Sequence, residues 1–175
     1  MIDKKAYREI VENLLQNNGQ YSPPINVSAI ANDLGITVLE ETMPQGDVSG
    51  FIAKRPDGKI CIYVNKDEHL NRQRFTIAHE LAHYYLHYKD KSVDQSGVLD
   101  FVEYRNGIYT EESTGKESEA NAFAAELLVP YYALEALWQA GYTDPAELAN
   151  KFVVSTEMMI YRLKNCFKDL NRAAR

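Results

Sequence analysis

An α+β fold is predicted by the order of two hydrophobic patterns along the 175-residue chain. Helical spacing comes first, short runs of β-branched and aromatic residues follow, and helical spacing then returns up to the C-terminus. A few strands set between runs of helices are typical of the α+β class. We therefore expect a small, mostly antiparallel three-stranded sheet packed on a long helix, with a helical C-terminal region.

Two helices are expected before the sheet. Residues 3–17 place apolar side chains three and four positions apart, and glycine and proline end this pattern. Asn26 or Ser28 can cap a second, short helix, which Gly35 stops.

Three strands are expected next, at residues 36–39, 48–54 and 59–65. The segment 56–58, Pro-Asp-Gly, has the composition of a tight turn. The last two strands should therefore form a hairpin.

Helices should make up most of the remaining chain. One is predicted over 70–87, and the polar segment that follows, up to residue 115, lacks a clear period and is a candidate for gating access to a site. We expect a core domain over 1–130 and a helical region over 131–175 that packs on it. The later helices are predicted at 117–128, 131–140, 145–151 and 155–170.

Composition narrows the class of protein. Apolar residues make up 45% of the chain and charged residues 25%, as in ordinary globular proteins. The net charge of −6 argues against general nucleic-acid binding. Without a signal peptide or a long apolar run, a cytoplasmic location away from membranes is expected. Cys61 and Cys166 are expected to be buried free thiols.

The most informative motif is His79-Glu80-Leu81-Ala82-His83. Histidines four residues apart share one helix face, so both imidazoles can reach one ion. Glu80 can then act as the general base on a water molecule beside the metal, as in HExxH metallopeptidases. Zinc suits two imidazoles and an open coordination position. The alternative is a pair of structural histidines without a metal.

A catalytic zinc needs a third protein ligand, and Glu117 and Glu119 on a later helix are the candidates. They point about 200° apart around the helix axis, so only one can face the metal. Asn121 lies one turn after Glu117 and could hydrogen-bond a liganding histidine. His87 continues the histidine spacing, but it lies about 12 Å along the helix from His79 and cannot share the same ion with both other histidines.

Two segments of the chain, 72–83 and 117–130, resemble the ImmA/IrrE family of metallopeptidases. The resemblance covers about Ile25 to Leu163. It implies a thermolysin-like site in which one zinc ion is held by two histidines and a glutamate, and it selects Glu117 as that glutamate. It does not identify the residue that stabilises the oxyanion, for which Arg74, Tyr88 and Tyr109 are candidates.

The predicted activity is hydrolysis of peptide bonds in a protein substrate. The substrate is expected to add as a strand to an exposed sheet edge, for which residues 59–65 are a candidate. By resemblance to the family, the partner is expected to be a helix-turn-helix repressor or an antitoxin.

Two other functions are open. Residues 145–164 have the outline of a helix-turn-helix, which would suit a regulator that binds DNA or a repressor. Its basic residues are few, and Arg162 is one of them, so packing or partner binding is favoured over DNA binding. A metal-binding module that grips a repressor without cutting it is the second alternative, although such a module would have no need of Glu80.

Overall fold

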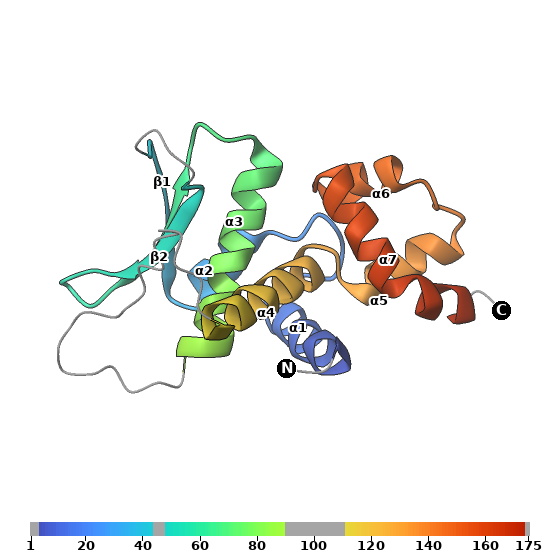
Figure 1. Ribbon diagram of the computed structural model, residues 1–175, viewed down its shortest axis with the longest axis horizontal. Helices are drawn as coiled ribbons and strands as arrows, with labels where there is room; N and C mark the ends of the chain where they lie inside the picture. Colours follow the sequence, from blue (N-terminus) through green and yellow to red (C-terminus); the bar gives the residue numbers. More distant parts are fainter. Residues whose placement is uncertain (1–3, 44–47, 90–110, 174–175) are drawn as a thin grey trace. The chain divides into compact units, whose positions relative to one another are not determined.

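The computed structural model describes residues 4–43, 48–89 and 111–173, and it confirms the α+β class (Figure 1). By their contacts the residues group into two compact units. The first runs from Val27 to Ala124, and the second joins the chain up to Asn26 with the chain from Ala125 onwards. The expected division into a core of 1–130 and a helical region of 131–175 stays a prediction. In the structure, α1 (Lys4–Asn17) groups with the C-terminal helices.

The first unit contains the sheet, whose strands are β1 (Ile36–Glu41), β2 (Gly50–Lys54) and β3 (Ile60–Asn65) in the order β1-β3-β2. The β2–β3 hairpin is antiparallel as predicted, but β1 pairs with β3 in parallel, so the sheet is mixed. The chain crosses from β1 to the far edge before it returns through the hairpin, which aligns β1 with β3. Central β3 therefore cannot be the predicted free edge.

Helix α3 (Leu70–His83) packs on β2 and β3, and α2 (Val27–Asp33) packs on β1 and α3. The contact between α3 and the sheet is so close that position 50 has no room for a side chain. A Cβ atom added to Gly50 would lie 2.6 Å from the Cγ2 atom of Thr76 and against the carbonyl oxygen of Tyr63. Glycine at this position therefore sets the depth at which α3 lies on the sheet.

The predicted helix over 70–87 changes its geometry near the end. After His83 the backbone continues as η1, a π-helical turn over Tyr84–Tyr88. Such wide turns are rare and often lie at functional sites. Helix α4 (Glu111–Leu128) begins six residues before the predicted start at 117. Its first turns lack the apolar period from which the helix was predicted, so the sequence pattern misses them.

The second unit contains α1, α5 (Tyr131–Gln139), α6 (Pro145–Phe152) and α7 (Thr156–Ala173). Val153 ends α6 in the left-handed conformation with φ of 53°, which is an outlier for a β-branched residue. The two cysteines are buried free thiols, as expected. Among the described residues, none of the helices combines the length and apolar character that a membrane crossing requires.

Candidate metal centre

The HExxH segment lies in the buried half of α3. Ala78, Leu81 and Ala82 are almost fully buried on either side of the two histidines. This packing fixes the helix, and the four-residue spacing then brings both imidazoles to one side of it. The Nε2 atoms of His79 and His83 lie 3.0 Å apart.

Glu117 of α4 completes the group. Its Oε1 atom lies 3.0 Å from Nε2 of His83, and its Oε2 atom lies 3.3 Å from Nε2 of His79. Ala120 and Ala124 are fully buried on the same helix, as expected for small residues that allow close packing.

These separations fit a zinc ion. Zinc binds histidine nitrogen and carboxylate oxygen at about 2.0 to 2.1 Å with tetrahedral angles, so neighbouring ligand atoms lie about 3.3 to 3.4 Å apart. The separation of the two Nε2 atoms, 3.0 Å, is close to that value, and so are the distances from each Nε2 atom to its nearer Glu117 oxygen, 3.0 Å to Oε1 and 3.3 Å to Oε2. The two imidazoles and the carboxylate of Glu117 therefore form a group that could bind a metal ion.

Asn121 lies where the helical spacing predicted, one turn after Glu117. Its Oδ1 atom is 3.0 Å from Nδ1 of His79. An amide oxygen can only accept a hydrogen bond, so Nδ1 of His79 must donate and carry the proton. In the neutral ring, Nε2 then presents a lone pair toward His83 and Glu117, which is the state that binds a metal.

The second histidine is bound differently. Nδ1 of His83 is buried and has no hydrogen-bond partner among the described residues. Nε2–H of His83 can instead donate to Glu117 when no ion is present, and metal binding would displace that proton.

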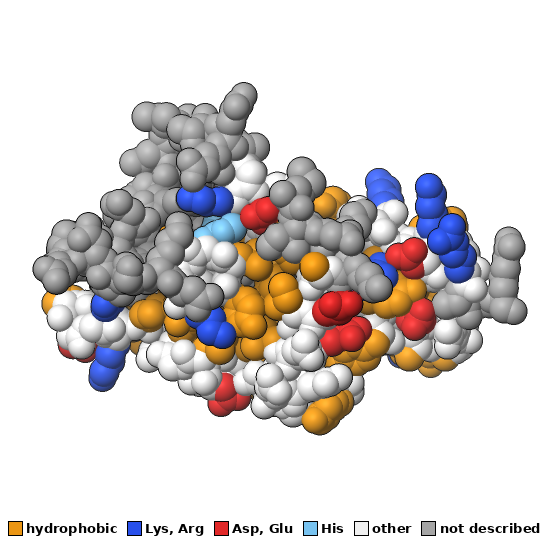
Figure 2. Space-filling view, turned by 90° about the horizontal axis from the view of Figure 1, so that it is seen from below, with side chains coloured by type: hydrophobic (Ala, Val, Ile, Leu, Met, Phe, Trp, Pro, Cys, Tyr) orange, Lys and Arg blue, Asp and Glu red, His pale blue; other side chains and the backbone are white. Residues whose placement is uncertain are grey.

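The group is buried on the histidine side and open on the glutamate side. The side chains of His79 and His83 are 5% and 6% exposed, whereas that of Glu117 is 25% exposed. On the face drawn in Figure 2, histidine atoms reach the molecular surface. A molecule could therefore approach the group from the side of the carboxylate.

His87 and Glu119 lie outside this three-residue group. Nε2 of His87 is 4.0 Å from Oε2 of Glu119, and its ring centroid is 5.7 Å from that of His83. Burial lowers the pKa of His87, and the neighbouring His83 acts in the same direction, while Glu119 opposes them. Of the two candidate glutamates, the structure thus brings only Glu117 to both histidines of the motif.

For the other predicted site residues, the structure gives burial but no distance to the group of His79, His83 and Glu117. Glu80 is half-buried beside His79 in the sequence. Among the oxyanion candidates, Tyr109 lies outside the described residues, and Arg74 and Tyr88 are half-buried. Burial lowers the pKa of Arg74.

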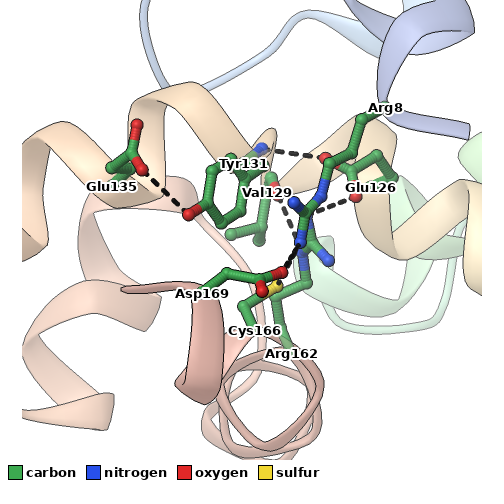
Figure 3. Close-up of polar contacts among 8 residues, drawn as sticks. All are labelled: Arg8, Glu126, Val129, Tyr131, Glu135, Arg162, Cys166 and Asp169. Carbon is green, nitrogen blue, oxygen red and sulfur yellow. Dashed lines mark hydrogen bonds and ion pairs between the residues drawn. The ribbon is translucent and has the colours of Figure 1, made fainter. Parts of the chain in front are cut away.

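Sequence reasoning missed a second buried polar cluster, in the second unit (Figure 3). Arg162 of α7 is only 8% exposed, and its Nη2 atom lies 2.5 Å from Oε2 of Glu126, which is 6% exposed. Nε of Arg162 donates to the carbonyl of Val129 at 2.9 Å. The other carboxylate oxygen of Glu126 accepts the backbone N–H of Tyr131 at 2.8 Å and so caps α5.

A second arginine borders this cluster (Figure 3). Nη2 of Arg8 lies 2.7 Å from Oδ2 of Asp169, and its guanidinium lies 3.7 Å above the ring of Tyr131. The hydroxyl of Tyr131 donates to Glu135 at 2.8 Å. Burial, helped by the charge of Glu135, raises the pKa of Tyr131 to about 12. A sequence pattern gives no sign of such pairs, because the partners are up to 161 positions apart.

Comparisons with known proteins agree with this fold. One solved structure, described as a Mycobacterium tuberculosis transcriptional regulator, matches with a TM-score of 0.63 and 22% identity. The match covers 90% of this chain and 46% of that protein, so the chain spans about half of its length. A search of curated proteins gives no significant match.

A family of sequences described as Peptidase_M78, the IrrE N-terminal-like domain, matches residues 31–164. The matched range includes the sheet, both helices of the candidate metal centre and most of the C-terminal helices. The resemblance seen in the two sequence segments is therefore confirmed, and the chain belongs to the family of IrrE N-terminal-like domains.

Proposed function

We propose that this protein is a zinc-dependent endopeptidase in which His79, His83 and Glu117 hold one zinc ion. The observation that carries the proposal is the convergence of two Nε2 atoms, 3.0 Å apart, with the carboxylate of Glu117, whose two oxygens lie 3.0 Å from His83 and 3.3 Å from His79. Lone pairs brought this close repel one another unless a proton, such as that on Nε2 of His83, or a cation lies between them. Membership of a peptidase family supports the same function.

The reaction assigns one step to each part of the site. When bound, zinc polarises the substrate carbonyl and acidifies a water molecule. Glu80 takes a proton from water as the water oxygen bonds to the carbonyl carbon. It then passes this proton to the amine nitrogen as the carbon–nitrogen bond breaks. Asn121 keeps His79 in the tautomer that binds metal.

The substrate would bind in an extended form along β2. Asn65 donates to Ser49 and Arg55 to Lys59 across the hairpin, and hydrogen-bonded pairs alternate in an antiparallel ladder. The backbone groups of Gly50, Ile52 and Lys54 therefore point away from β3. Among the described residues β2 pairs only with β3, so this edge can accept a further strand.

The proposed substrate class is a helix-turn-helix repressor or an antitoxin. Support comes from the family resemblance and from the M. tuberculosis structure, which is described as a transcriptional regulator. A protease that removes a repressor would control transcription without contacting DNA itself.

Elemental analysis tests the metal site. Wild-type protein should hold about one zinc per chain, Glu117→Ala should lose it, and Glu119→Ala, a matched change two residues away, should keep it. Retention of zinc by Glu117→Ala would overturn the ligand assignment.

Co-expression with the repressor or antitoxin made by a neighbouring gene, followed by mass spectrometry, tests the reaction. Glu80→Gln should retain zinc and lower the cleavage rate about 100-fold or more. Normal cleavage by this variant would contradict the role of Glu80.

The alternative is a regulator that binds a repressor or DNA without hydrolysis. It is supported by the similarity in fold to the M. tuberculosis protein, which is described as a transcriptional regulator. Stable association of the zinc-loaded wild type with an intact repressor, without cleavage products, would select this alternative.

A further inference from the structure

The outward side of α7 exposes large apolar side chains. Tyr161 and Phe167 are each 54% exposed, and Ile160 is 38% exposed. Ile160 and Phe167 lie two helical turns apart on the same side of the helix. Phe167 also meets Trp138 of α5, with ring centroids 6.3 Å apart. Apolar atoms grouped in this way at the surface mark a contact site more often than single exposed residues do.

A row of cations runs beside these apolar residues. Lys164, Lys168 and Arg172 are exposed on three successive turns of α7. They form no ion pair with any residue that the structure describes. Glu157 is the one acidic residue on this side, since Asp169 is paired with Arg8. A basic face in a chain of net charge −6 is complementary to an acidic partner.

DNA does not fit this face. In a helix-turn-helix, the first residues of the second helix contact base edges and need polar or basic side chains. Here that part of α7 presents Glu157, Ile160 and Tyr161. Arg162, the cation nearest to them, is buried against Glu126 and cannot reach a ligand. The helix pair therefore has the outline of a DNA-binding motif without its chemistry.

We propose that the outward face of α7 binds an acidic amphipathic helix of a partner protein. An apolar stripe on that helix would cover Ile160 and Phe167, and acidic residues beside the stripe would meet Lys164, Lys168 and Arg172. Tyr161 lies among these cations, where an apolar side chain of the partner could also reach its ring. In this type of recognition the bound helix presents its apolar anchors three, four and seven residues apart. The proposal goes beyond the peptidase function and does not depend on it, since its readout is binding.

The experiment selects peptides of about 16 residues, or four to five helical turns, from a displayed random library with the immobilised full-length chain. Enriched peptides should carry an excess of Asp and Glu and apolar residues at helical spacing. Their affinities are then measured with synthetic peptides and two double variants. Lys164→Glu with Lys168→Glu, and Ile160→Ser with Phe167→Ser, should each weaken binding about tenfold or more.

Matched controls are available elsewhere on the chain. Lys59→Glu with Lys66→Glu makes the same change of charge at exposed positions, and Tyr21→Ser with Leu70→Ser removes exposed apolar side chains. Both control pairs should bind the peptides within about twofold of wild type. Circular dichroism should show that all four variants remain folded.

Three results would overturn the proposal. The first is enrichment of peptides without an acidic excess. The second is an equal loss of affinity in the control variants. The third is evidence that another molecule binds this face while the wild type enriches no acidic peptide. Such evidence would be salt-sensitive binding of duplex DNA, or sedimentation of the protein as a dimer, that the α7 variants abolish.

Discussion

The two buried polar clusters of this protein differ in how their charges are balanced. In the second unit, Arg162 meets Glu126, and the carboxylate also accepts the N–H of Tyr131. In the first unit, two imidazoles and the carboxylate of Glu117 converge, and together they offer more acceptors than donors. The opposite charges of Arg162 and Glu126 offset each other in one cluster, whereas the other cluster could bind a cation.

This difference separates a structural site from a candidate functional one. A buried pair of opposite charges holds helices in place and does not require a further ion. In the group of His79, His83 and Glu117, side-chain atoms of the kind that bind metals face one another, so this group could hold an ion. Buried charge alone therefore does not indicate function, whereas unbalanced charge does.

The largest expected effect comes from removing one partner of the buried ion pair between Arg162 and Glu126. Arg162→Met leaves the Glu126 carboxylate buried without its partner and should lower the free energy of unfolding by about 3–5 kcal/mol. Urea denaturation measures this loss. Adding Glu126→Gln should recover at least about half of it, because the amide oxygen can still accept the N–H of Tyr131. A double variant no more stable than the single one would show that packing, not charge, dominates here.

The next largest effect is expected when zinc binds the group of His79, His83 and Glu117. Zinc at about 100 times its dissociation constant should stabilise the wild type by about 2.7 kcal/mol, which raises the melting temperature by about 5–10 °C. Thermal denaturation with and without zinc measures the shift. Glu117→Ala should abolish it, while Glu119→Ala should retain it. An equal shift in Glu117→Ala would mean that zinc binds elsewhere.

A smaller effect is expected at the residue that orients His79. Asn121→Ala removes the acceptor for Nδ1 and should weaken zinc binding about tenfold. Competition with a chelator measures the affinity. Because Asn121 is exposed, the metal-free stability should change by less than about 1 kcal/mol. Ser118→Ala, an exposed change on the same helix, serves as control and should leave zinc affinity unaltered.

The smallest effect concerns pH. The pKa of Tyr131 rises from 10 in the unfolded chain to about 12 in the fold, mainly through burial. The folded state therefore holds this proton more tightly, and stability should fall as pH rises from 10 to 12. Screening by water should limit the loss to about 1 kcal/mol. Tyr131→Phe should remove this part of the decline, and an unchanged alkaline profile would contradict it.

Local pattern was enough to predict most helices, all three strands and the placement of the two motif histidines on one helix face. His79 and His83 follow from a four-residue spacing, and the same rule relates Glu117 to Asn121. The choice of Glu117 over Glu119 came from family resemblance, and the distances agree with it. The roles of these residues as ligands stay a prediction.

Features that depend on long-range packing could not be predicted from the sequence. The parallel pairing of β1 with β3 depends on where the chain crosses, which no local pattern records. The edge predicted at 59–65 was wrong for this reason. Arg162 was counted among the basic residues of a possible helix-turn-helix, but it is buried and paired with Glu126, which lies 36 positions earlier. The π-helical turn after His83 gave no signal in the pattern of apolar residues.

Gly50 allows strand β2 and helix α3 to pack in direct contact, so that the two should move together. With no side chain between them, the backbone of β2 rests directly against Thr76, one turn before His79. A chain that pairs with the outer edge of β2 therefore pushes on the same rigid body that carries the two imidazoles. The position of a bound substrate strand and the position of the two histidines would therefore both be set by the packing of β2 against α3.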